Sequence, residues 1–236
     1  TAVSACFTDT MVRKGIYFGM KEKPPFSPGY DLVGVIDKIG PKTSLFKIGD
    51  KVADLTVTGS YTEYICLPEL SLTMVPEGLD DGEAVSMVLS YMTAYQMFTR
   101  SAVVNAGQTI LVHGAGGAVG TALLQIAAVM GVKVYGTGSS SKQKLISELG
   151  ATSIDYKNET ISDRMMEMEP QGIDAVFDAI GGESFKTSFK LLKKGGILVP
   201  YGFYKNSTGQ GGNVALEFMQ LKLWNMLPNG KKVNFY

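Results

Sequence analysis

An unbroken run of glycine and alanine at residues 114–118 separates two apolar segments of the chain. Where such a turn leaves a buried strand and opens a helix, it presents unpaired backbone N–H groups and the positive end of the helix dipole to an anion. In the pattern Ala115-x-Gly117-x-x-Gly120, Gly117 would admit a pyrophosphate close to the backbone, and Gly120 would let the helix pack on the strand. The pattern predicts a dinucleotide site; the alternative is a tight turn without a ligand.

The segment that follows the glycines by about 20 residues bears on which dinucleotide is bound. A protein that prefers NAD places an Asp or Glu there, on the ribose 2′-hydroxyl, but no acid appears before Glu148. Hydroxyls and a lysine can instead hydrogen-bond and neutralise a 2′-phosphate. The candidate residues, Gly138, Ser139 and Lys142, therefore favour NADP(H) over NAD(H). The alternative is that residues 139–144 only cap and solvate the first turn of a helix.

Charge and cysteine content argue against several other classes of function. The 236 residues include 22 basic and 22 acidic side chains, so the chain carries no basic footprint for nucleic acid. Its two cysteines, Cys6 and Cys66, form no C-x-x-C pair and predict neither a disulfide framework nor a thiolate metal cluster. No signal peptide can be read in the sequence, and a reducing, cytoplasmic location is the expectation.

The apolar run at residues 110–132 raises a competing interpretation as a membrane span. Its only ionisable residue is His113, and its Gly116-x-x-x-Gly120 spacing resembles a contact face between membrane helices. Each glycine in its first half would weaken a spanning helix by about 1 kcal/mol, and flanking arginines and an aromatic belt are missing. We therefore expect no membrane span, and we interpret His113 as a packed core residue rather than a base.

The two halves of the chain differ in their periodicity. Up to about Met87 the pattern is short and β-like, with strands predicted at residues 32–39, 51–55 and 61–67. Apolar residues then recur at helical spacing over residues 81–102. From Gln108 onward, strands predicted at 109–112, 133–135, 153–155, 174–177 and 197–199 alternate with helices predicted at 122–130, 142–149 and 184–192. This alternation predicts a doubly wound α/β unit with a parallel sheet, and residues 204–213 form a glycine- and polar-rich loop.

Six segments, taken in order along the chain, resemble a known family. They read ACFTD at 5–9, VRKGIY at 12–17, PGYDLVG at 28–34, IGDKV at 48–52, YMTAY at 91–95 and VHGAGGAVG at 112–120. Together they resemble the medium-chain dehydrogenase/reductases, and among these the zinc-independent quinone oxidoreductases similar to zeta-crystallin. The resemblance covers essentially the whole chain.

The resemblance implies an α/β protein of two domains with the cofactor and substrate in the cleft between them. A GroES-like, β-rich catalytic domain is expected over residues 1–88, and a doubly wound Rossmann domain that binds NADP(H) over residues 89–236. Family members have further strands before the position of Thr1 and a segment that returns to the catalytic domain after that of Tyr236, so the catalytic domain is expected to be incomplete in this chain. A homodimer through the sheet edge near residues 231–236 is also implied.

The cofactor residues that the resemblance implies fall into three groups. Those over the phosphates are Gly117, Ala118 and Val119. Those near the adenosine 2′-phosphate are Ser139, Lys142 and Tyr156. Those at the nicotinamide end are Thr93, Ile180, Gly181, Gly202 and Phe203.

A catalytic zinc site is not expected. The alcohol dehydrogenases of the same superfamily read Cys-His-Thr-Asp and Gly-His-Glu where this chain reads Cys6-Phe7-Thr8-Asp9 and Gly29-Tyr30-Asp31. Cys6 remains as a possible ligand, but Tyr30 takes the place of the histidine, so three ligands are not available. We interpret Cys6 as a small residue in a half-buried strand rather than as a reactive thiol.

The expected activity is an NADPH-dependent, zinc-independent transfer of hydride to a quinone or a related conjugated carbonyl, a small-molecule electron acceptor. Negative charge that builds on oxygen would be met by hydrogen-bond donors or water, and a quinol oxygen needs little help because it is a weak base. No catalytic residue is assigned, since Tyr30, Tyr91, Tyr201 and Tyr204 fit aromatic packing better than proton donation. The alternatives are an alkenal or enone double-bond reductase and a non-enzymatic NADPH-binding protein, crystallin-like or similar to the vesicle amine transport proteins.

Overall fold

The computed structural model describes residues 1–17, 20 and 22–236. The chain divides into two compact units, Thr1–Met92 and Thr93–Tyr236. The domain boundary predicted between residues 88 and 89 lies in the same helical stretch as this division and stays a prediction.

The first unit is built on a three-stranded antiparallel sheet in the order β1-β2-β3. Leu32 pairs with Asp54, and Val52 pairs with Met74. The core of this unit is formed by Val33 of β1, Val75 directly after β3, and Ala84 and Val85 of α2 (Asp81–Ser86). Its elements are α1 (Phe7–Arg13), β1 (Leu32–Val35), β2 (Lys51–Asp54), η1 (Glu69–Ser71), β3 (Thr73–Met74) and α2 (Asp81–Ser86).

The strand predicted at residues 61–67 is wrong. These residues form turns and irregular backbone, and Tyr64 is 77% exposed. Tyr61 attaches the segment to the unit through its side chain, since its hydroxyl donates to the Ser4 carbonyl at 3.0 Å. The alternation in the sequence therefore came from apolar side chains that face solvent, and β3 forms later in the chain.

The helix predicted over residues 81–102 is confirmed, with π-helical segments inside it. Asp80 caps its start by accepting from the backbone N–H groups of Gly82 at 2.8 Å and Glu83 at 3.2 Å. After α2 the helical stretch continues as η2 (Met87–Tyr91), α3 (Met92–Gln96) and η3 (Met97–Ser101).

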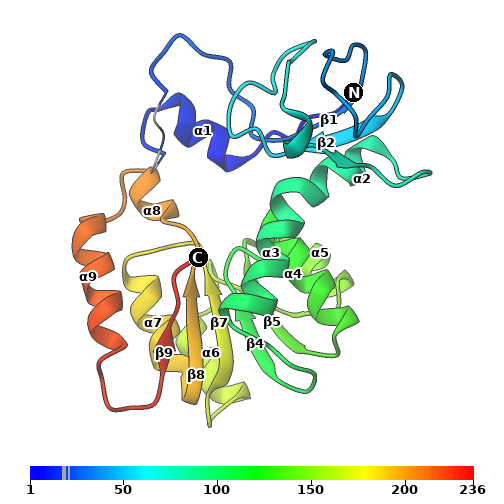
Figure 1. The fold of residues 1–236 in the computed structure, drawn as a ribbon. Coiled ribbons are helices and arrows are strands. Elements are labelled where there is room, and N and C mark those ends of the chain that lie inside the picture. The colour runs from blue at the N-terminus through cyan, green and yellow to red at the C-terminus, as the bar shows by residue number, and fades with distance from the viewer. Residues whose placement is uncertain (18–19, 21) are drawn as a thin grey trace. The chain divides into compact units, whose positions relative to one another are not determined.

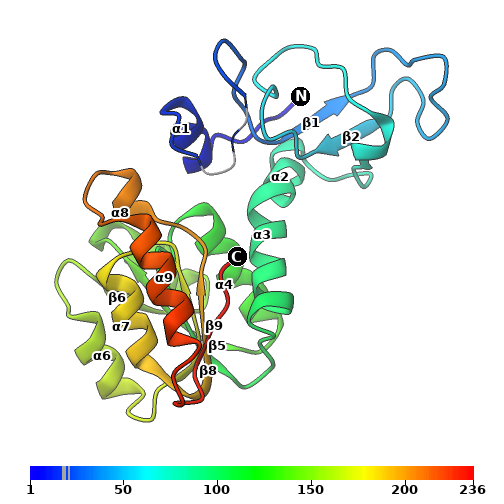
Figure 2. The same cartoon turned by 60° about the vertical axis from the view of Figure 1, so that its left-hand side comes forward.

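The second unit is a doubly wound α/β fold, as predicted. Its six-stranded sheet has the order β6-β5-β4-β7-β8-β9 with parallel pairing, which is the strand order of dinucleotide-binding sheets. Helices α4 and α5 lie on one side of the sheet and α6, α7 and α9 on the other (Figures 1 and 2). The strands are β4 (Thr109–Val112), β5 (Lys133–Gly138), β6 (Thr152–Asp155), β7 (Ile173–Asp178), β8 (Leu192–Pro200) and β9 (Lys232–Val233). The helices are α4 (Ala118–Val129), η4 (Ser140–Lys142), α5 (Gln143–Glu148), α6 (Ile161–Met168), α7 (Glu183–Leu191), α8 (Tyr204–Ser207) and α9 (Val214–Trp224).

The membrane-span interpretation of residues 110–132 is contradicted. The run is divided into β4 and the twelve-residue helix α4 by the glycine turn. Among the described residues, no helix combines the length and the apolar character that a membrane crossing requires. Leu111 and Val112 are instead fully buried in the centre of the sheet.

Three elements of the second unit were not predicted from the sequence. They are α6, α9 and the short helix α8, with which the loop predicted at residues 204–213 begins. The sheet edge that the resemblance implies near residues 231–236 contains the short strand β9. Helix α9 is apolar around most of its circumference, with Leu216, Met219 and Leu223 more than half exposed. It therefore lacks the one-sided pattern that marks an amphipathic helix.

The predicted packing role of Gly120 is confirmed. A Cβ atom at this position would lie 2.7 Å from the Ala115 Cα and even closer to the Gly114 carbonyl oxygen. Contacts this short with backbone cannot be relieved by a side-chain rotation. The absence of a side chain at Gly120 therefore sets how closely α4 approaches the end of β4.

We expect the substitution Gly120→Ala to destabilise the second unit by about 1–3 kcal/mol through overpacking. The free energy of unfolding is measured by urea denaturation followed through Trp224, the single tryptophan of the chain, which stacks on Phe189. Gly212→Ala is the control, because a Cβ there meets only Glu217 Oε1 at 3.6 Å. Equal losses in the two variants would contradict the packing argument.

Candidate functional site

The glycine turn places the N-terminus of α4 at the carboxyl edge of the sheet, and no side chain caps this N-terminus. Gly114 has a φ of +67°, and Gly117 N–H donates to the Gly114 carbonyl at 2.9 Å. Helix α4 then begins with Gly117 as its N-cap residue and has no side-chain cap. Gly117 and Ala118 are exposed and Val119 half-buried, so the first N–H groups of the helix are available to an anion.

Other helices of the same chain show what a cap looks like here. Asp80 caps α2, and Asn213 accepts from Ala215 N at 2.9 Å and Leu216 N at 3.4 Å at the start of α9. Helix α4 differs from both, and its first turn also contains no acidic residue. Helices α5, α6 and α7 also begin without a side-chain cap, so the missing cap alone does not mark α4 as a ligand site.

Lys142 lies against the glycine turn. A Cβ atom on Gly116 would be 2.9–3.1 Å from the Cβ, Cγ and Cδ atoms of Lys142. The aliphatic part of the lysine side chain therefore packs on Gly116, in the space that a side chain at this residue would fill. In the described chain Lys142 has no ion-pair partner, whereas Lys144 Nζ lies 3.8 Å from Glu148 Oε1. A positive charge is thus held close to the open helix end.

The other residues predicted around a 2′-phosphate lie at the same edge. Gly138 ends β5 and pairs with Asp155 at the end of β6, and Tyr156 N–H donates to the Gly138 carbonyl at 3.3 Å. Ser139 stands at the cap position of η4, but its side chain makes no capping hydrogen bond. Its hydroxyl instead lies 3.1 Å from that of Ser141. Residues 140–142 are exposed, so the alternative of a solvated first turn stays open.

Gly138 also has a packing reason to be glycine. A Cβ there would lie 2.6 Å from the Ile146 Cδ1 and 3.2 Å from the Lys142 Cβ. The small residue therefore lets η4 and α5 approach the end of β5, which brings Lys142 to the glycine turn.

The two predicted nicotinamide segments lie side by side. They follow β7 and β8, and Tyr204 N–H donates to the Ala179 carbonyl at 2.9 Å while Lys205 N–H donates to the Ile180 carbonyl at 3.0 Å. A Cβ on Gly202 would lie 3.1 Å from the Ala179 carbonyl oxygen. The absence of a side chain at Gly202 therefore permits this close pairing.

The remaining predicted site residues are placed less directly. The Phe203 ring packs among Phe185 of α7, Phe218 of α9 and Phe235, at centroid distances of 5.6, 5.1 and 5.7 Å. Its side chain is therefore part of the packing between these helices and the sheet. Thr93 lies half-buried in α3, and no hydrogen bond among the described residues joins it to the glycine turn.

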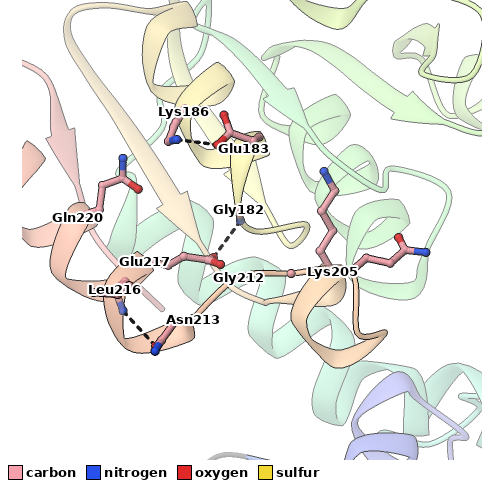
Figure 3. A pocket seen from close by; sticks show the side chains of 11 residues that line it. Gly182, Glu183, Lys186, Lys205, Gly212, Asn213, Leu216, Glu217 and Gln220 are labelled. Atoms are coloured by element: carbon pink, nitrogen blue, oxygen red, sulfur yellow. Dashed lines mark hydrogen bonds and ion pairs between the residues drawn. The ribbon is translucent and has the colours of Figure 1, made fainter.

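A hollow of about 280 Å³ lies beside the Gly181–Gly182 turn, between the start of α7 and the start of α9 (Figure 3). Its buried acid Glu217 accepts from Gly182 N at 2.9 Å and from Asn206 Nδ2 at 3.0 Å. Glu183 pairs with Lys186 at 2.6 Å. The acids of this hollow are engaged by the protein itself, and Glu217 anchors the turn after β7.

His113 is a packed core residue, as predicted. It is 2% exposed, and burial lowers the pKa of its imidazole below the ordinary value. Its ring nitrogens contact the hydroxyls of Thr137 and Ser188. Tyr201 donates to the His113 carbonyl at 3.4 Å, and burial beside Asp178 raises the pKa of the tyrosine. Neither group is arranged as a proton donor to an outside molecule.

Cys6 does not lie in a strand, contrary to the prediction. It is the N-cap residue of α1, and its backbone N–H and Sγ both face Asp9 Oδ2, at 2.8 and 3.0 Å. Burial and the adjacent Asp9 raise the pKa of the thiol to about 11. The interpretation of Cys6 as a poorly reactive thiol is strengthened by this environment.

Comparisons with known proteins agree with this architecture. The family model for the alcohol dehydrogenase GroES-like domain matches residues 1–77, and the model described as zinc-binding dehydrogenase matches residues 118–226. Human quinone oxidoreductase is 34% identical over 198 residues, which cover 82% of this chain and 60% of that protein. The chain belongs to the medium-chain dehydrogenase/reductase superfamily. Its relatives support the zinc-independent quinone oxidoreductase branch, with GroES-like and Rossmann domains.

One further sequence relative and one solved structure are similar to this chain over most of its length. The zebrafish synaptic vesicle membrane protein VAT-1 homolog is 35% identical over 220 residues, covering 92% of this chain and 45% of that protein. A mycobacterial structure complexed with NADPH superposes with a TM-score of 0.83 at 26% identity, covering 99% of this chain and 70% of that one. The chain spans 45–60% of the length of the VAT-1 homologs and quinone oxidoreductases that it matches. The cytoplasmic location stays a prediction.

The residues at the positions of the zinc ligands of the alcohol dehydrogenases are hydrogen-bonded to other side chains of this chain. Cys6 is bonded to Asp9, and Tyr30, at the position of the histidine, lies with its hydroxyl 2.9 Å from that of Tyr17. Among the described residues no three His, Cys, Asp or Glu side chains converge as metal ligands. That the protein works without zinc stays a prediction.

We expect Cys6 to alkylate slowly, because the thiolate is the reactive form. A pKa raised from 9.0 to about 11 leaves about 100-fold less thiolate at pH 8. The Cys66→Ser variant is treated with iodoacetamide between pH 7 and 10, and the Cys6 rate should still be rising at pH 10. The Cys6→Ser variant isolates the exposed Cys66 as the fast control. A Cys6 rate that levels off near pH 9 would contradict the prediction.

Proposed function

We propose that this protein is an NADPH-dependent, zinc-independent reductase that delivers hydride to a quinone or a related conjugated carbonyl. The observation that carries the proposal is the open N-terminus of α4 with the Lys142 stem laid over Gly116. Backbone N–H groups and the helix dipole suit a pyrophosphate there, and the adjacent ammonium suits a further phosphate. The residues present therefore fit this cofactor.

The preference for NADPH over NADH rests on the residues after β5. The described chain has no acid between β5 and α5, so no carboxylate stands ready to bind a ribose 2′-hydroxyl or to repel a 2′-phosphate. Asp155, at the end of β6, is engaged by Lys157 N at 3.0 Å and Asn158 Nδ2 at 2.8 Å. The relative solved with NADPH supports the same choice.

Bound NADPH supplies the hydride, so the protein has to orient the cofactor and exclude side reactions. In the proposal, the backbone around Ile180, Gly181 and Gly202 lines the nicotinamide, and Glu217 holds that turn through Gly182 N. Tyr201 and His113 keep their protons inside the protein. This favours an acceptor whose reduced oxygen needs no strong acid, as a quinone does, with solvent as the proton source.

Two alternatives stay open beside this proposal. An alkenal or enone reductase uses the same cofactor on a more demanding acceptor. A non-enzymatic NADPH-binding function is kept because a relative with 35% identity is named as a synaptic vesicle membrane protein and not as an oxidoreductase. A homodimer through β9 is also proposed, because this strand is the outer edge of the six-stranded sheet and an edge strand has unpaired backbone groups.

The nucleotide site is tested by binding of NADPH and NADH to the wild type and to Lys142→Glu. We expect the wild type to prefer NADPH and the variant to lose about 10- to 100-fold of that preference, because a charge-assisted hydrogen bond is replaced by repulsion. Lys144→Glu is the control, with a side chain that is 88% exposed and paired with Glu148. An equal effect of both substitutions would point to general charge instead of a site at Gly116.

The reaction is tested by NADPH oxidation with a simple benzoquinone and a simple enone. We expect turnover of the quinone to exceed that of the enone, because the quinol oxygen requires no protein acid. Faster enone turnover would favour the double-bond reductase. Tight NADPH binding without oxidation by either acceptor would favour the non-enzymatic function.

A further inference from the structure

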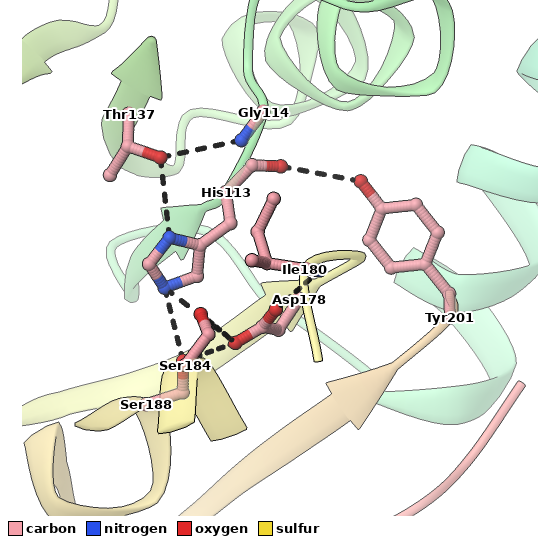
Figure 4. A network of polar contacts seen from close by, with 8 residues as sticks. All are labelled: His113, Gly114, Thr137, Asp178, Ile180, Ser184, Ser188 and Tyr201. Atoms are coloured by element: carbon pink, nitrogen blue, oxygen red, sulfur yellow. Dashed lines mark hydrogen bonds and ion pairs between the residues drawn. The ribbon is translucent and has the colours of Figure 1, made fainter. Parts of the chain in front are cut away.

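The carboxyl ends of β4, β5 and β7 are joined by a buried polar network (Figure 4). Its side chains are His113, Thr137, Asp178 and Ser188, and each is at most 2% exposed. Asp178 Oδ2 accepts from Ser188 Oγ at 2.7 Å, and Asp178 Oδ1 accepts from Ile180 N at 2.8 Å. The carboxylate thus holds the turn after β7 by its backbone.

The directions of these hydrogen bonds follow from counting protons. Ser188 has one hydroxyl proton and donates it to Asp178, so it must accept from His113 Nε2, which lies 3.0 Å away. The imidazole is neutral in this buried place, so Nδ1 then carries a lone pair and accepts from the Thr137 hydroxyl at 3.2 Å. Thr137 Oγ1 in turn accepts from Gly114 N at 3.3 Å. Only the tautomer with its proton on Nε2 satisfies every group.

The network therefore forms one directed chain of hydrogen bonds. It runs from Gly114 N–H through Thr137, His113 and Ser188 to Asp178, whose second oxygen holds Ile180 N–H. One end is the first residue of the glycine turn, and the other is the turn that Glu217 also anchors. These two turns are 66 residues apart, on the neighbouring strands β4 and β7.

We propose that Asp178, Ser188 and His113 are positioning residues that fix the turn after β7 relative to the glycine turn, and so couple the two ends of a bound dinucleotide. The inference rests on the proposed NADPH function and adds residues that contact neither end directly. Ser184 supplies a matched comparison, because its hydroxyl also donates to Asp178 Oδ2, at 2.8 Å, but is not part of the chain to His113.

The first measurement is binding of NADPH and of adenosine 2′,5′-bisphosphate, which has the adenosine end and no nicotinamide. In Ser188→Ala we expect NADPH to weaken about tenfold while the bisphosphate changes by less than about threefold. In Ser184→Ala we expect the ratio of the two affinities to stay near that of the wild type. Trp224 fluorescence verifies that each variant is folded.

The second measurement needs no nucleotide. His113 is the only histidine in the chain, so ¹⁵N-histidine labelling gives a single imidazole whose tautomer is read by NMR. We expect the proton on Nε2 in the wild type. In Asp178→Asn we expect the amide oxygen to accept from Ile180 N–H and the amide nitrogen to donate to the Ser188 hydroxyl. Ser188 then donates its own proton to His113 Nε2, so the imidazole proton moves to Nδ1.

Each outcome decides the proposal. A wild-type proton on Nδ1, or equal weakening of both nucleotides in a folded Ser188→Ala variant, overturns the coupling and leaves the NADPH function standing. A folded wild type that binds neither nucleotide overturns the proposed function, and the coupling falls with it. An Nε2 proton that moves in Asp178→Asn, together with selective loss of NADPH affinity in Ser188→Ala, supports the coupling.

Discussion

The close approach of α4 to the end of β4 is the constraint on which the proposed nucleotide edge depends. Gly120 packs against the Gly114 carbonyl and the Ala115 backbone, with no room for a Cβ atom. This contact aims the helix axis at the carboxyl edge of the sheet and leaves its first N–H groups outside. The same glycines thus serve packing and an anion, so the glycine pattern alone does not distinguish a ligand site from a tight turn.

What distinguishes the two is the surrounding chemistry. Helix α4 starts with a glycine, without a side-chain cap and with no acid in its first turn. Helices α5, α6 and α7 also lack a side-chain cap, but α4 has Lys142 laid against the turn that precedes it. With glycine at its N-cap, α4 forgoes roughly a few tenths of a kcal/mol relative to a side-chain cap. Lys142 adds a positive charge at the place where the helix dipole is also positive, which disfavours the unliganded state further. Both features are unfavourable alone and become favourable when an anion binds.

The sequence predicted the second unit well because its signals are local. The buried strands 109–112 and 174–177 are short apolar runs flanked by turns, and Gly120 follows at the spacing that helix packing requires. The strand predicted at 61–67 failed because alternation does not reveal which side of a segment is covered, and Tyr64 is exposed. The short helix α1 was missed because it depends on contacts between Cys6 and Asp9 rather than on periodicity.

Asp178 and Glu217 were missed for a different reason. Each is a buried acid whose role depends on a residue distant in sequence. Glu217 lies 35 residues from Gly182, whose N–H it accepts. Asp178 bonds directly to the nearby Ile180, Ser184 and Ser188, but Ser188 connects it to His113, which is 75 residues from that serine. Only the strand order places them together. An acid that ends an apolar strand, as Asp178 does in IDAVFD, is the signal that could have marked one of them.

A buried histidine and a buried carboxylate are costly unless every polar atom finds a partner. Here each ring nitrogen of His113 and each oxygen of Asp178 is hydrogen-bonded. Aliphatic side chains of similar volume would fill the same space without that demand, but apolar packing has no direction and tolerates small shifts between strands. A hydrogen-bond chain in which every proton is assigned permits one arrangement of the strand ends. The position of the turn after β7 is therefore set by hydrogen-bond direction as well as by packing.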